Sequence, residues 1–352
     1  MAKTVLITGA SGYVGSHVCE QLLVAGFRVR AIARAGKVNT LRKSFTSHSD
    51  RFEVVELQDI TNSDLSDVLK GVFAIVHVAV YLPFESEGAE KMIPGTIDSV
   101  LNIVKQAEAA GVKHIVVTGT FATVMNPQGT FSHDDWNPIT KEAAIQSKDQ
   151  MAVYAAAKKY SELALWEWAE AHPNVEVTTV SPPIVFGPWP SEFYMPTPNF
   201  GSTTIAMWNL LKPEGQLTGP AIPYYIDVRD LAKAHVLAIT HSAPTSKVGR
   251  KRLVISSPHA LDWEKAINIV KEERQQLADR VIKKTPYKFP PRAIIDLGRV
   301  KEVLGMKAED FHTFEATILD SIDNCLKLEK EWISSGHEVN VPDLGPFVPA
   351  AE

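Results

Sequence analysis

Short apolar runs alternate with amphipathic stretches through the first half of the chain. The runs predict strands at Thr4–Thr8, Arg28–Ala33, Phe52–Leu57, Ala74–Val78, His114–Thr118 and Glu176–Ser181. The amphipathic stretches predict helices at Tyr13–Ala25, Ser63–Lys70, Ile97–Ala110 and Gln150–His172. Strands that are apolar throughout and separated by helices indicate a parallel sheet covered on both faces. The pattern therefore predicts a doubly wound α/β fold.

This alternation stops after Gly187-Pro188. The next run, Trp189–Asn199, contains three prolines and predicts a loop that is a candidate lid. Beyond it, helices predicted at Asp262–Leu277 and Phe311–Trp332 mix with isolated strands. We therefore expect a change of architecture near residue 188.

Length and composition are those of an ordinary globular protein. The 352 residues can bury a sizeable core, and 45% are apolar and 22% charged. We expect residues 1–188, with parts of 220–260, to form the sheet domain. Residues 189–352 should mainly form a smaller lobe, not an independent domain, on the carboxyl ends of the strands.

Charge and cysteine content exclude several classes of partner. The net charge of −5, without a basic run, gives no footprint for nucleic acid or an acidic membrane. Two distant cysteines and scattered histidines predict neither a disulfide framework nor a metal site. The chain has no apolar run of about 18 residues, no room for a signal peptide and no recognised C-terminal signal. We expect a cytoplasmic protein, either a monomer or a homodimer.

A glycine-rich turn follows the first predicted strand. Gly9 allows a tight turn, Gly12 lets the backbone approach a diphosphate, and Gly15 permits close helix–strand packing. The first N–H groups of the following helix and its dipole attract negative charge. The spacing is G-x-x-G-x-x-G, not G-x-G-x-x-G, but its place between strand and helix predicts Rossmann-type dinucleotide binding. The expected contacts come from Gly9, Ser11, Gly12, Tyr13, Val14 and Gly15.

The end of the second strand distinguishes the two nicotinamide dinucleotides. An acidic residue there binds the ribose 2′-hydroxyl of NAD, and a basic residue accommodates the 2′-phosphate of NADP. Here Arg34 follows the strand, Lys37 comes soon after, and neither Asp nor Glu lies nearby. The alternative is a solvated loop arginine. The sequence favours NADP(H), bound by Arg34 and Lys37.

Tyr154 and Lys158 are four residues apart and share one face of a predicted helix. A tyrosine ordinarily keeps its proton up to a pKa of about 10. A neighbouring ammonium favours the phenolate and moves that pKa toward the range where a proton is exchanged with a substrate oxygen. An exposed helix pair is the alternative. Downstream of a dinucleotide turn, the pair predicts a general acid and its cationic partner.

Four stretches together resemble the extended short-chain dehydrogenase/reductases: Thr8–Gly15, Val117–Val124, Tyr154–Lys158 and Tyr225–Ala232. The resemblance covers most of the chain and is strongest over residues 4–240. It is greatest to the branch of dihydroflavonol reductase, cinnamoyl-CoA reductase and the fungal methylglyoxal and aldehyde reductases. It implies a dinucleotide-binding domain, a substrate-binding lobe and NADPH-dependent reduction of an aldehyde or ketone to an alcohol.

The family also implies a Ser-Tyr-Lys triad, whose serine position is Thr120 here. Threonine keeps the hydroxyl, and its added methyl group stiffens χ1. Thr118 and Thr123 are alternatives for this role. The resemblance implies that Tyr154 protonates the developing alkoxide. It also implies that Lys158 lowers the tyrosine pKa and binds the nicotinamide ribose, and that Thr120 hydrogen-bonds the carbonyl oxygen.

Further cofactor contacts that the resemblance implies come from the ends of three strands: Asp59 and Ile60 at the adenine, Val78, Ala79 and Val80 at the adenine ribose and phosphates, and Pro182, Pro183 and Ile184 at the nicotinamide carboxamide. Each has an alternative as an ordinary strand-end core or turn residue. Asp227, Arg229 and Asp230 resemble the family's lobe-joining motif, which we interpret as structural.

The expected substrate wall is mostly apolar: Tyr81, Phe84, Phe121, Val124, Met125, Asn126, Tyr194, Met195 and Trp208. Asn126 is the candidate polar contact, because its position contacts the flavonoid in the plant reductases. The same positions are alternatively ordinary core. The apolar character argues against a sugar nucleotide and for an apolar or aromatic carbonyl compound. His77 is interpreted as a buried structural histidine.

Four other functions remain alternatives. A sugar-nucleotide dehydratase would carry an acidic pair directly after the strand-five threonine, where Phe121 and Ala122 stand. An epimerase would keep NAD bound, which Arg34 disfavours. A 3β-hydroxysteroid-type dehydrogenase is not excluded by the triad. A dinucleotide-sensing protein without catalysis would ordinarily lack a tyrosine and a lysine at this spacing.

Overall fold

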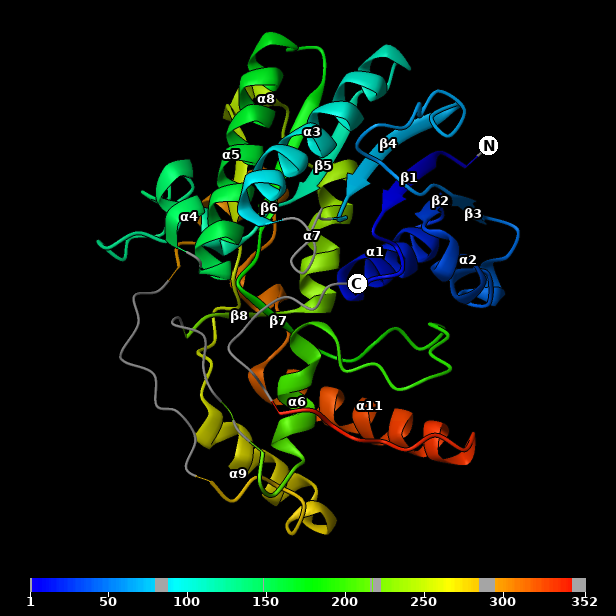
Figure 1. Cartoon of the computed structure of the whole chain (residues 1–352), viewed down its shortest axis with the longest axis vertical. Coiled ribbons are helices and arrows are strands. Elements are labelled where there is room, and N and C mark those ends of the chain that lie inside the picture. The colour runs from blue at the N-terminus through cyan, green and yellow to red at the C-terminus, as the bar shows by residue number, and fades with distance from the viewer. Residues whose placement is uncertain are drawn as a thin grey trace.

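A seven-stranded parallel sheet forms the centre of the upper part of the molecule (Figure 1). The computed structural model describes residues 2–79, 88–147, 149–215, 217, 223–284 and 295–343. The strands lie in the order β3-β2-β1-β4-β5-β6-β9, and each neighbouring pair is parallel. Their bounds are β1 Thr4–Thr8, β2 Arg28–Ala33, β3 Phe52–Glu56, β4 Val72–His77, β5 His114–Thr118, β6 Glu176–Ser181 and β9 Lys251–Val254. The predicted doubly wound α/β fold is confirmed.

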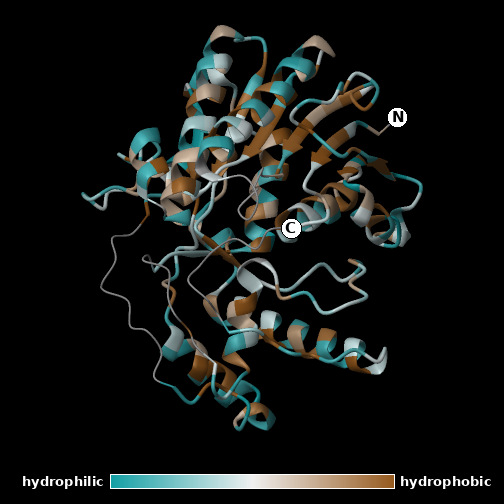
Figure 2. Ribbon diagram, in the orientation of Figure 1, coloured by the Kyte–Doolittle hydropathy of each residue, from teal (hydrophilic) through white to brown (hydrophobic). Residues whose placement is uncertain are grey.

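Helices cover both faces of this sheet. The helices of the described residues are α1 Tyr13–Val24, α2 Ala35–Arg42, α3 Gly88–Ala109, α4 Lys141–Ser147, α5 Gln150–Ala171, α6 Ile205–Leu210, α7 Val228–Thr240, α8 Thr245–Val248, α9 Trp263–Glu273, α10 Gly298–Leu304 and α11 Phe314–Ser334. Of these, α6, α9 and α11 lie in the lower part of the molecule and do not cover the sheet (Figure 1). Successive side chains of a strand point to opposite faces. Val5 and Ile7 of β1 accordingly pack with α1 and α7, whereas Leu6 packs with α3 and α5. Figure 2 shows the resulting apolar strands between helices of mixed hydropathy.

The prediction of a helix at Ser63–Lys70 is wrong. This segment, which connects β3 to β4, is a series of turns. Leu65 and Leu69 are buried as a helix would require. Side chains from elsewhere bind the segment's backbone instead. Arg30 donates to two of its carbonyl oxygens at 2.8 and 2.9 Å, and the Gln106 side-chain oxygen accepts from the Leu65 N–H at 2.7 Å.

Two helix starts also differ from the predicted ones. Helix α3 begins at Gly88, well before the predicted start at Ile97, and includes Pro94. Helix α11 begins after Thr313, whose side chain accepts from the Ala316 N–H at 3.1 Å and caps the first turn. The apolar periodicity that predicts a helix does not reveal such local starts.

The lower part of the molecule contains α6, α9 and α11 and a separate pair of parallel strands, β7 (Ile184–Phe186) and β8 (Tyr225–Asp227) (Figure 1). One hydrophobic core extends from the sheet into it, from Val5 of β1 to Trp332 of α11. The loop predicted at Trp189–Asn199 has neither helix nor strand. The domain boundary at residue 188 stays a prediction.

Asp227 and Arg229 connect the end of β8 to α11. The Asp227 carboxylate accepts from Arg229 at 2.8 Å and from the Thr317 hydroxyl at 2.8 Å, and Arg229 also pairs with Asp320 at 2.6 Å. Burial alone raises the pKa of Asp227, but the hydrogen bonds and charge of Arg229 lower it overall. A second link joins Asp230 to the His312 ring at 2.7 Å. These contacts support the structural interpretation of the motif.

Candidate active site

The carboxyl ends of the parallel strands bring the predicted site residues to one edge of the sheet. The strand order reverses between β1 and β4, which are neighbours although β2 and β3 intervene in the sequence. In open α/β sheets, ligands bind in the crevice at such a point. Gly9 follows β1, Arg34 follows β2, Ala79 lies just beyond β4, and Thr120 lies just beyond β5.

The turn after β1 requires glycine at two positions. Gly9 has φ of +72°, and a Cβ there would lie 2.7 Å from the Ala79 nitrogen. A Cβ on Gly15 would lie 2.0 Å from the Gly9 carbonyl oxygen. Helix α1 can therefore pack against the turn only because residue 15 has no side chain. Gly12 begins α1 with no side-chain cap, and the first turn has no acidic residue. This arrangement fits a diphosphate at the helix N-terminus.

Tyr13 differs from the other turn residues, because its side chain points into the protein. It is 3% exposed, and its hydroxyl donates to the Gly187 carbonyl at 2.6 Å. Its ring also packs against Trp189 at 5.0 Å between centroids. The side chain therefore secures the loop after β7, and only the backbone of Tyr13 is left for the predicted cofactor contact. Ser11 and Val14 are partly buried in the turn.

Arg34 and Lys37 lie at the carboxyl end of β2, where the first turn of α2 begins. Arg34 is exposed and directly precedes this helix, and Lys37 is partly buried. The Lys37 N–H donates to the Arg34 carbonyl at 2.8 Å. Because Arg34 is exposed and lies outside helix and strand, the alternative of a solvated arginine stays open. Two cations beside the glycine turn fit an anionic group on the dinucleotide's adenosine ribose.

Asp59 organises the turn after β3. Its carboxylate accepts from the Thr61 N–H and the Asn62 side chain, both at 2.8 Å, and these hydrogen bonds lower its pKa. The Ile60 carbonyl accepts from Asn102 at 2.8 Å. Asp59 thus has a local structural role, and its predicted adenine contact stays a prediction.

The backbone beyond β4 is bound to Thr8. The Val78 N–H donates to the Thr8 carbonyl at 3.3 Å, and the Ala79 N–H donates to the Thr8 hydroxyl at 3.2 Å. The strand end is thereby fixed beside the glycine turn. The predicted residues Val80, Tyr81 and Phe84 lie outside the described residues.

Lys158 is directed at the end of β5. Its Nζ donates to the Thr118 carbonyl at 3.0 Å, and the side chain is 8% exposed. Burial lowers its pKa to about 8, although the charge of Glu162 opposes the shift. Tyr154 is partly buried one helical turn earlier. Its pKa is raised by burial, and a hydrogen bond with Thr120 opposes the rise. The expected lowering of the tyrosine pKa by Lys158 is therefore not seen in this arrangement.

The three threonines near β5 have different hydrogen-bond partners. The Thr118 hydroxyl is bonded to the His235 ring at 2.8 Å. The Thr123 side chain is fully buried and donates to the Thr120 carbonyl at 3.0 Å. The Thr120 hydroxyl accepts from a backbone N–H at 3.3 Å and bonds with Tyr154. The geometry thus favours Thr120 as the hydroxyl of the predicted triad.

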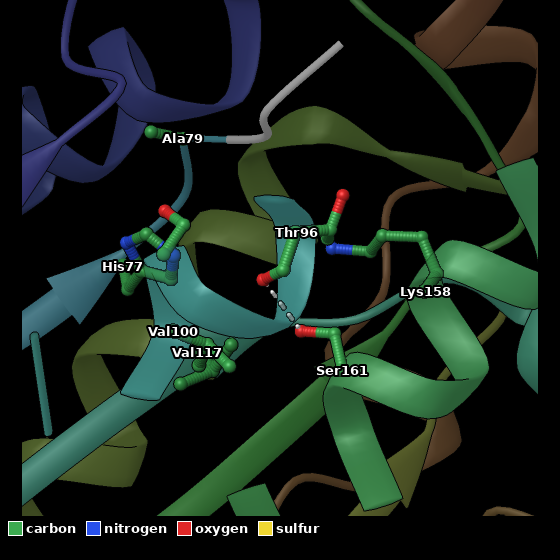
Figure 3. A pocket seen from close by; sticks show the side chains of 8 residues that line it. His77, Ala79, Thr96, Val100, Val117, Lys158 and Ser161 are labelled. Carbon is green, nitrogen blue, oxygen red and sulfur yellow. Dashed lines mark hydrogen bonds between the residues drawn. The ribbon is translucent and has the colours of Figure 1, made fainter. Parts of the chain in front are cut away.

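A cavity of about 10 Å³ lies beside Lys158, close to the volume that one water needs. Its lining residues are His77, Ala79, Thr96, Ser99, Val100, Val117, Lys158 and Ser161. Figure 3 shows His77 and Lys158 on opposite sides of it, and Ser161 bonded to the Thr96 carbonyl at 3.3 Å. Burial and the charge of Lys158 lower the pKa of His77 to about 3. His77 is bonded to Thr8 at 2.8 Å and is a buried structural histidine, as predicted.

Pro182 and Ile184 lie beyond β6. The Pro182 carbonyl accepts from the Phe121 N–H at 2.8 Å, which joins the ends of β5 and β6. Ile184 is buried in β7. Their predicted contact with the nicotinamide carboxamide stays a prediction.

Part of the predicted substrate wall lies directly after Thr120. Phe121 and Val124 are buried and Met125 partly buried in one apolar cluster, in which Phe121 packs on Tyr224 at 5.2 Å. Asn126 forms a local turn: its amide donates to the Val124 carbonyl at 3.1 Å and its oxygen accepts from a backbone N–H at 2.8 Å. Phe121 is 1% exposed and Val124 0%, so the place of these residues in the substrate wall stays a prediction.

The remaining members of the predicted wall lie elsewhere. Trp208 is 2% exposed and stacks on Trp332 at 5.5 Å, so core residues surround the indole, and its role in the pocket stays a prediction. Tyr194 is 38% exposed beside Lys43, with the ammonium 5.0 Å from the ring. Met195 is partly buried, and its carbonyl accepts from Trp332 at 2.9 Å. Neither geometry supports a role in the pocket.

Two charged residues beside the triad were missed in the sequence. Glu162 continues the four-residue spacing of Tyr154 and Lys158 and shares their helix face, which is a readable signal. Arg252 on β9 pairs with Glu162 at 3.0 Å and is 1% exposed. A buried arginine in a strand could not be anticipated from periodicity, because arginine is ordinarily exposed.

The comparison with known families places these residues in context. Residues 5–250 match the model of the NAD-dependent epimerase/dehydratase family. The chain belongs to this family. The predicted resemblance to extended short-chain dehydrogenase/reductases is thereby confirmed.

Its relatives include fungal oxidoreductases. An uncharacterized oxidoreductase of Schizosaccharomyces pombe is 33% identical over 266 residues, or 72% of this chain and 77% of that protein. Aldehyde reductase 2 of Sporidiobolus salmonicolor is 30% identical over 276 residues, or 74% of this chain and 78% of that protein. The structure of the yeast methylglyoxal/isovaleraldehyde reductase Gre2 complexed with NADPH has a TM-score of 0.76 and 26% identity, covering 93% of this chain and 99% of Gre2.

Metal ligation and membrane insertion have no support in the part of the chain that the structure describes. Within those ranges, no three His, Cys, Asp or Glu residues are grouped so as to hold a metal ion. No helix in them combines the length and apolar character needed to cross a membrane.

Proposed function

We propose that this protein is an NADP(H)-dependent reductase that converts an aldehyde or ketone into an alcohol. The observation that carries the proposal is the grouping of Thr120, Tyr154 and Lys158 at the carboxyl end of β5. This end lies at the same edge of the sheet as the glycine turn after β1. The fungal relatives named as reductases support the same reaction class.

The residues present fit the nicotinamide dinucleotide. Backbone N–H groups from Gly12 to Gly15 would bind the diphosphate, Arg34 the 2′-phosphate, and Lys158 the nicotinamide ribose. Bound NADPH supplies the hydride that reduces the carbonyl carbon. The protein contributes orientation, exclusion of water and a positioned proton.

Tyr154 supplies that proton. Its raised pKa keeps the phenol protonated at neutral pH, so its Oη carries a proton to give to the carbonyl oxygen as negative charge develops there. Thr120 hydrogen-bonds the same oxygen and aligns it with the phenol. Lys158 is charged below its pKa of about 8, and in that form its ammonium would hydrogen-bond the hydroxyls of the nicotinamide ribose.

The substrate is proposed to be an apolar or aromatic carbonyl compound. Phe121, Val124 and Met125 present an apolar cluster directly after Thr120. A sugar-nucleotide dehydratase would need acidic residues where Phe121 and Ala122 stand. The lobe beyond residue 188 would complete the substrate pocket, and we expect a cytoplasmic monomer or homodimer.

The test is loss of NADPH absorbance with 2-ketoaldehydes, β-ketoesters and aryl ketones, with Tyr154→Phe as the inactive control. The proposal is supported if the wild type oxidises NADPH when a substrate is added and Tyr154→Phe does not. Tightly bound NAD released by denaturing the purified protein, together with no activity on any carbonyl compound, would favour an epimerase instead.

A further inference from the structure

Arg252 and Glu162 form a buried ion pair between β9 and α5. Arg252 is 1% exposed and Glu162 6%, and the Arg252 Nε donates to the Glu162 carboxylate at 3.0 Å. The Thr179 hydroxyl of β6 donates to the same carboxylate oxygen at 2.8 Å. The pair thereby attaches α5 to the last two strands of the sheet.

The other nitrogens of the same guanidinium bind the loop that follows β5. Nη1 donates to the carbonyl oxygens of His133 at 2.8 Å and Asp135 at 2.5 Å. Nη2 donates to the Thr123 hydroxyl at 3.2 Å, and the Trp136 ring lies 3.6 Å from the guanidinium carbon. A planar guanidinium suits this arrangement because its five donors have fixed directions.

The contacts of Arg252 with the loop and with Glu162 are both close to residues of the triad. Thr123 donates to the Thr120 carbonyl at 3.0 Å, and the Asn137 N–H donates to the Thr123 carbonyl at 2.8 Å. On the helix, Glu162 lies one turn beyond Lys158 and two turns beyond Tyr154, on the same face. Arg252 therefore contacts the Thr120 loop on one side and the Tyr154 helix on the other.

We propose that Arg252 is a positioning residue that sets the distance between the Thr120 loop and the helix carrying Tyr154 and Lys158. The inference rests on the proposed function for its catalytic consequence. Stability alone does not explain the pair, because apolar residues that replace a buried ion pair are often neutral or stabilising. The hydrogen bonds from one guanidinium to Glu162 and to the loop, by contrast, specify a geometry that an apolar side chain would not.

The experiment compares three variants of the full chain. Arg252→Met alone leaves the Glu162 carboxylate buried without a partner charge. A lower kcat in this variant could therefore come either from a destabilised fold or from lost positioning. The double variant Arg252→Met/Glu162→Gln removes both charges. Because loss of the Glu162 charge also lowers the pKa of Lys158, the kcat of the double variant is compared in the acidic part of the pH profile, where Lys158 is charged in wild type and variant alike. The control Arg250→Met/Glu170→Gln removes an exposed ion pair between the residue just before β9 and the same helix, and neither of these side chains bonds to the loop.

Three quantities are measured for each variant: Tm, NADPH affinity, and kcat with KM for a carbonyl substrate. We expect the double variant to keep its Tm and NADPH affinity near wild type while kcat falls about tenfold or more, since small misplacements of reacting groups are costly. The control should match the wild type throughout. A folded double variant with wild-type kcat would overturn the proposal.

Hydrogen exchange provides a readout that does not depend on substrate. Peptides covering Thr120–Asn137 should exchange faster in the double variant, because the loop loses its contacts with Arg252, whereas peptides of β1 should be unchanged. If the double variant does not fold, Thr123→Val, which breaks one of these contacts, should still speed exchange in the same peptides. Unchanged exchange there would contradict the inference, whereas an inactive wild type would contradict only the proposed function.

Discussion

The Nζ of Lys158 donates a hydrogen bond to the backbone carbonyl of Thr118, 3.0 Å away. This bond ties α5 to the end of β5, just before Thr120. Because the ammonium is buried, its pKa falls to about 8, and the charge of Glu162 limits the fall. The cation of the candidate site therefore titrates close to the physiological range.

The first prediction is a loss of activity at alkaline pH. Lys158 is charged below about pH 8 and neutral above it, so kcat/KM should decline as pH rises through this value. Glu162→Gln removes the charge that raises the pKa of Lys158, so the midpoint should move to lower pH. A pH profile of kcat/KM from 6 to 10 measures both. A flat wild-type profile would exclude Lys158 as the titrating group.

Tyr154→Phe should abolish turnover and leave NADPH affinity nearly unchanged. The substitution removes only the phenol oxygen, which is the proposed proton donor and the partner of Thr120. General acid catalysis typically contributes about 10²–10⁴-fold. Steady-state kinetics and NADPH titration test the two parts separately. Retention of more than about a tenth of wild-type kcat would refute the assignment.

Arg34 should determine the choice of cofactor. We expect NADPH to be used in preference to NADH, and Arg34→Asp to reverse or erase the preference. A hydrogen bond to a charged group is typically worth about 1.5–3 kcal/mol, or roughly ten- to a hundredfold in kcat/KM. The measurement is kcat/KM with each cofactor. Equal kcat/KM values for NADPH and NADH in the wild type would contradict this prediction.

Thr120→Val should reduce kcat/KM sharply, because valine keeps the β-branched shape and removes the hydroxyl. Thr120→Ser should remain active. Thr123→Val is the matched comparison, and it should cost less, since the Thr123 hydroxyl is buried and bonds to the Thr120 carbonyl and to Arg252. If Thr123→Val were the damaging change and Thr120→Val were tolerated, the triad would need reassignment.

Much of the fold could be predicted because its signals are local and periodic. Strands such as Thr4–Thr8 are apolar on both faces, and the parallel sheet follows from their alternation with helices. The glycine turn was readable because Gly9 and Gly15 have no room for a Cβ. The segment Ser63–Lys70 was misread because Arg30 and Gln106 satisfy its backbone from distant positions, which no local pattern reveals.

The candidate site was predictable to the extent that its residues follow strand ends or helix spacing. Tyr154 and Lys158 satisfy both conditions, and Glu162 extends the same spacing. Trp208 shows where the sequence stops, because an aromatic side chain gives the same sequence signal in a core as in a pocket. Arg252 could not be found at all, because its importance comes from contacts between β9 and a loop more than a hundred residues earlier.

Transfer of deuterium from NADPH that carries deuterium in place of both hydrogens at the nicotinamide C4 tests the central claim most directly. The wild-type protein is incubated with the labelled cofactor and a carbonyl compound that it consumes, and the alcohol is analysed by mass spectrometry. The account predicts an alcohol that carries the deuterium at the former carbonyl carbon, and no such product from Tyr154→Phe. Unlabelled alcohol, or no alcohol from any carbonyl compound tested, would contradict it.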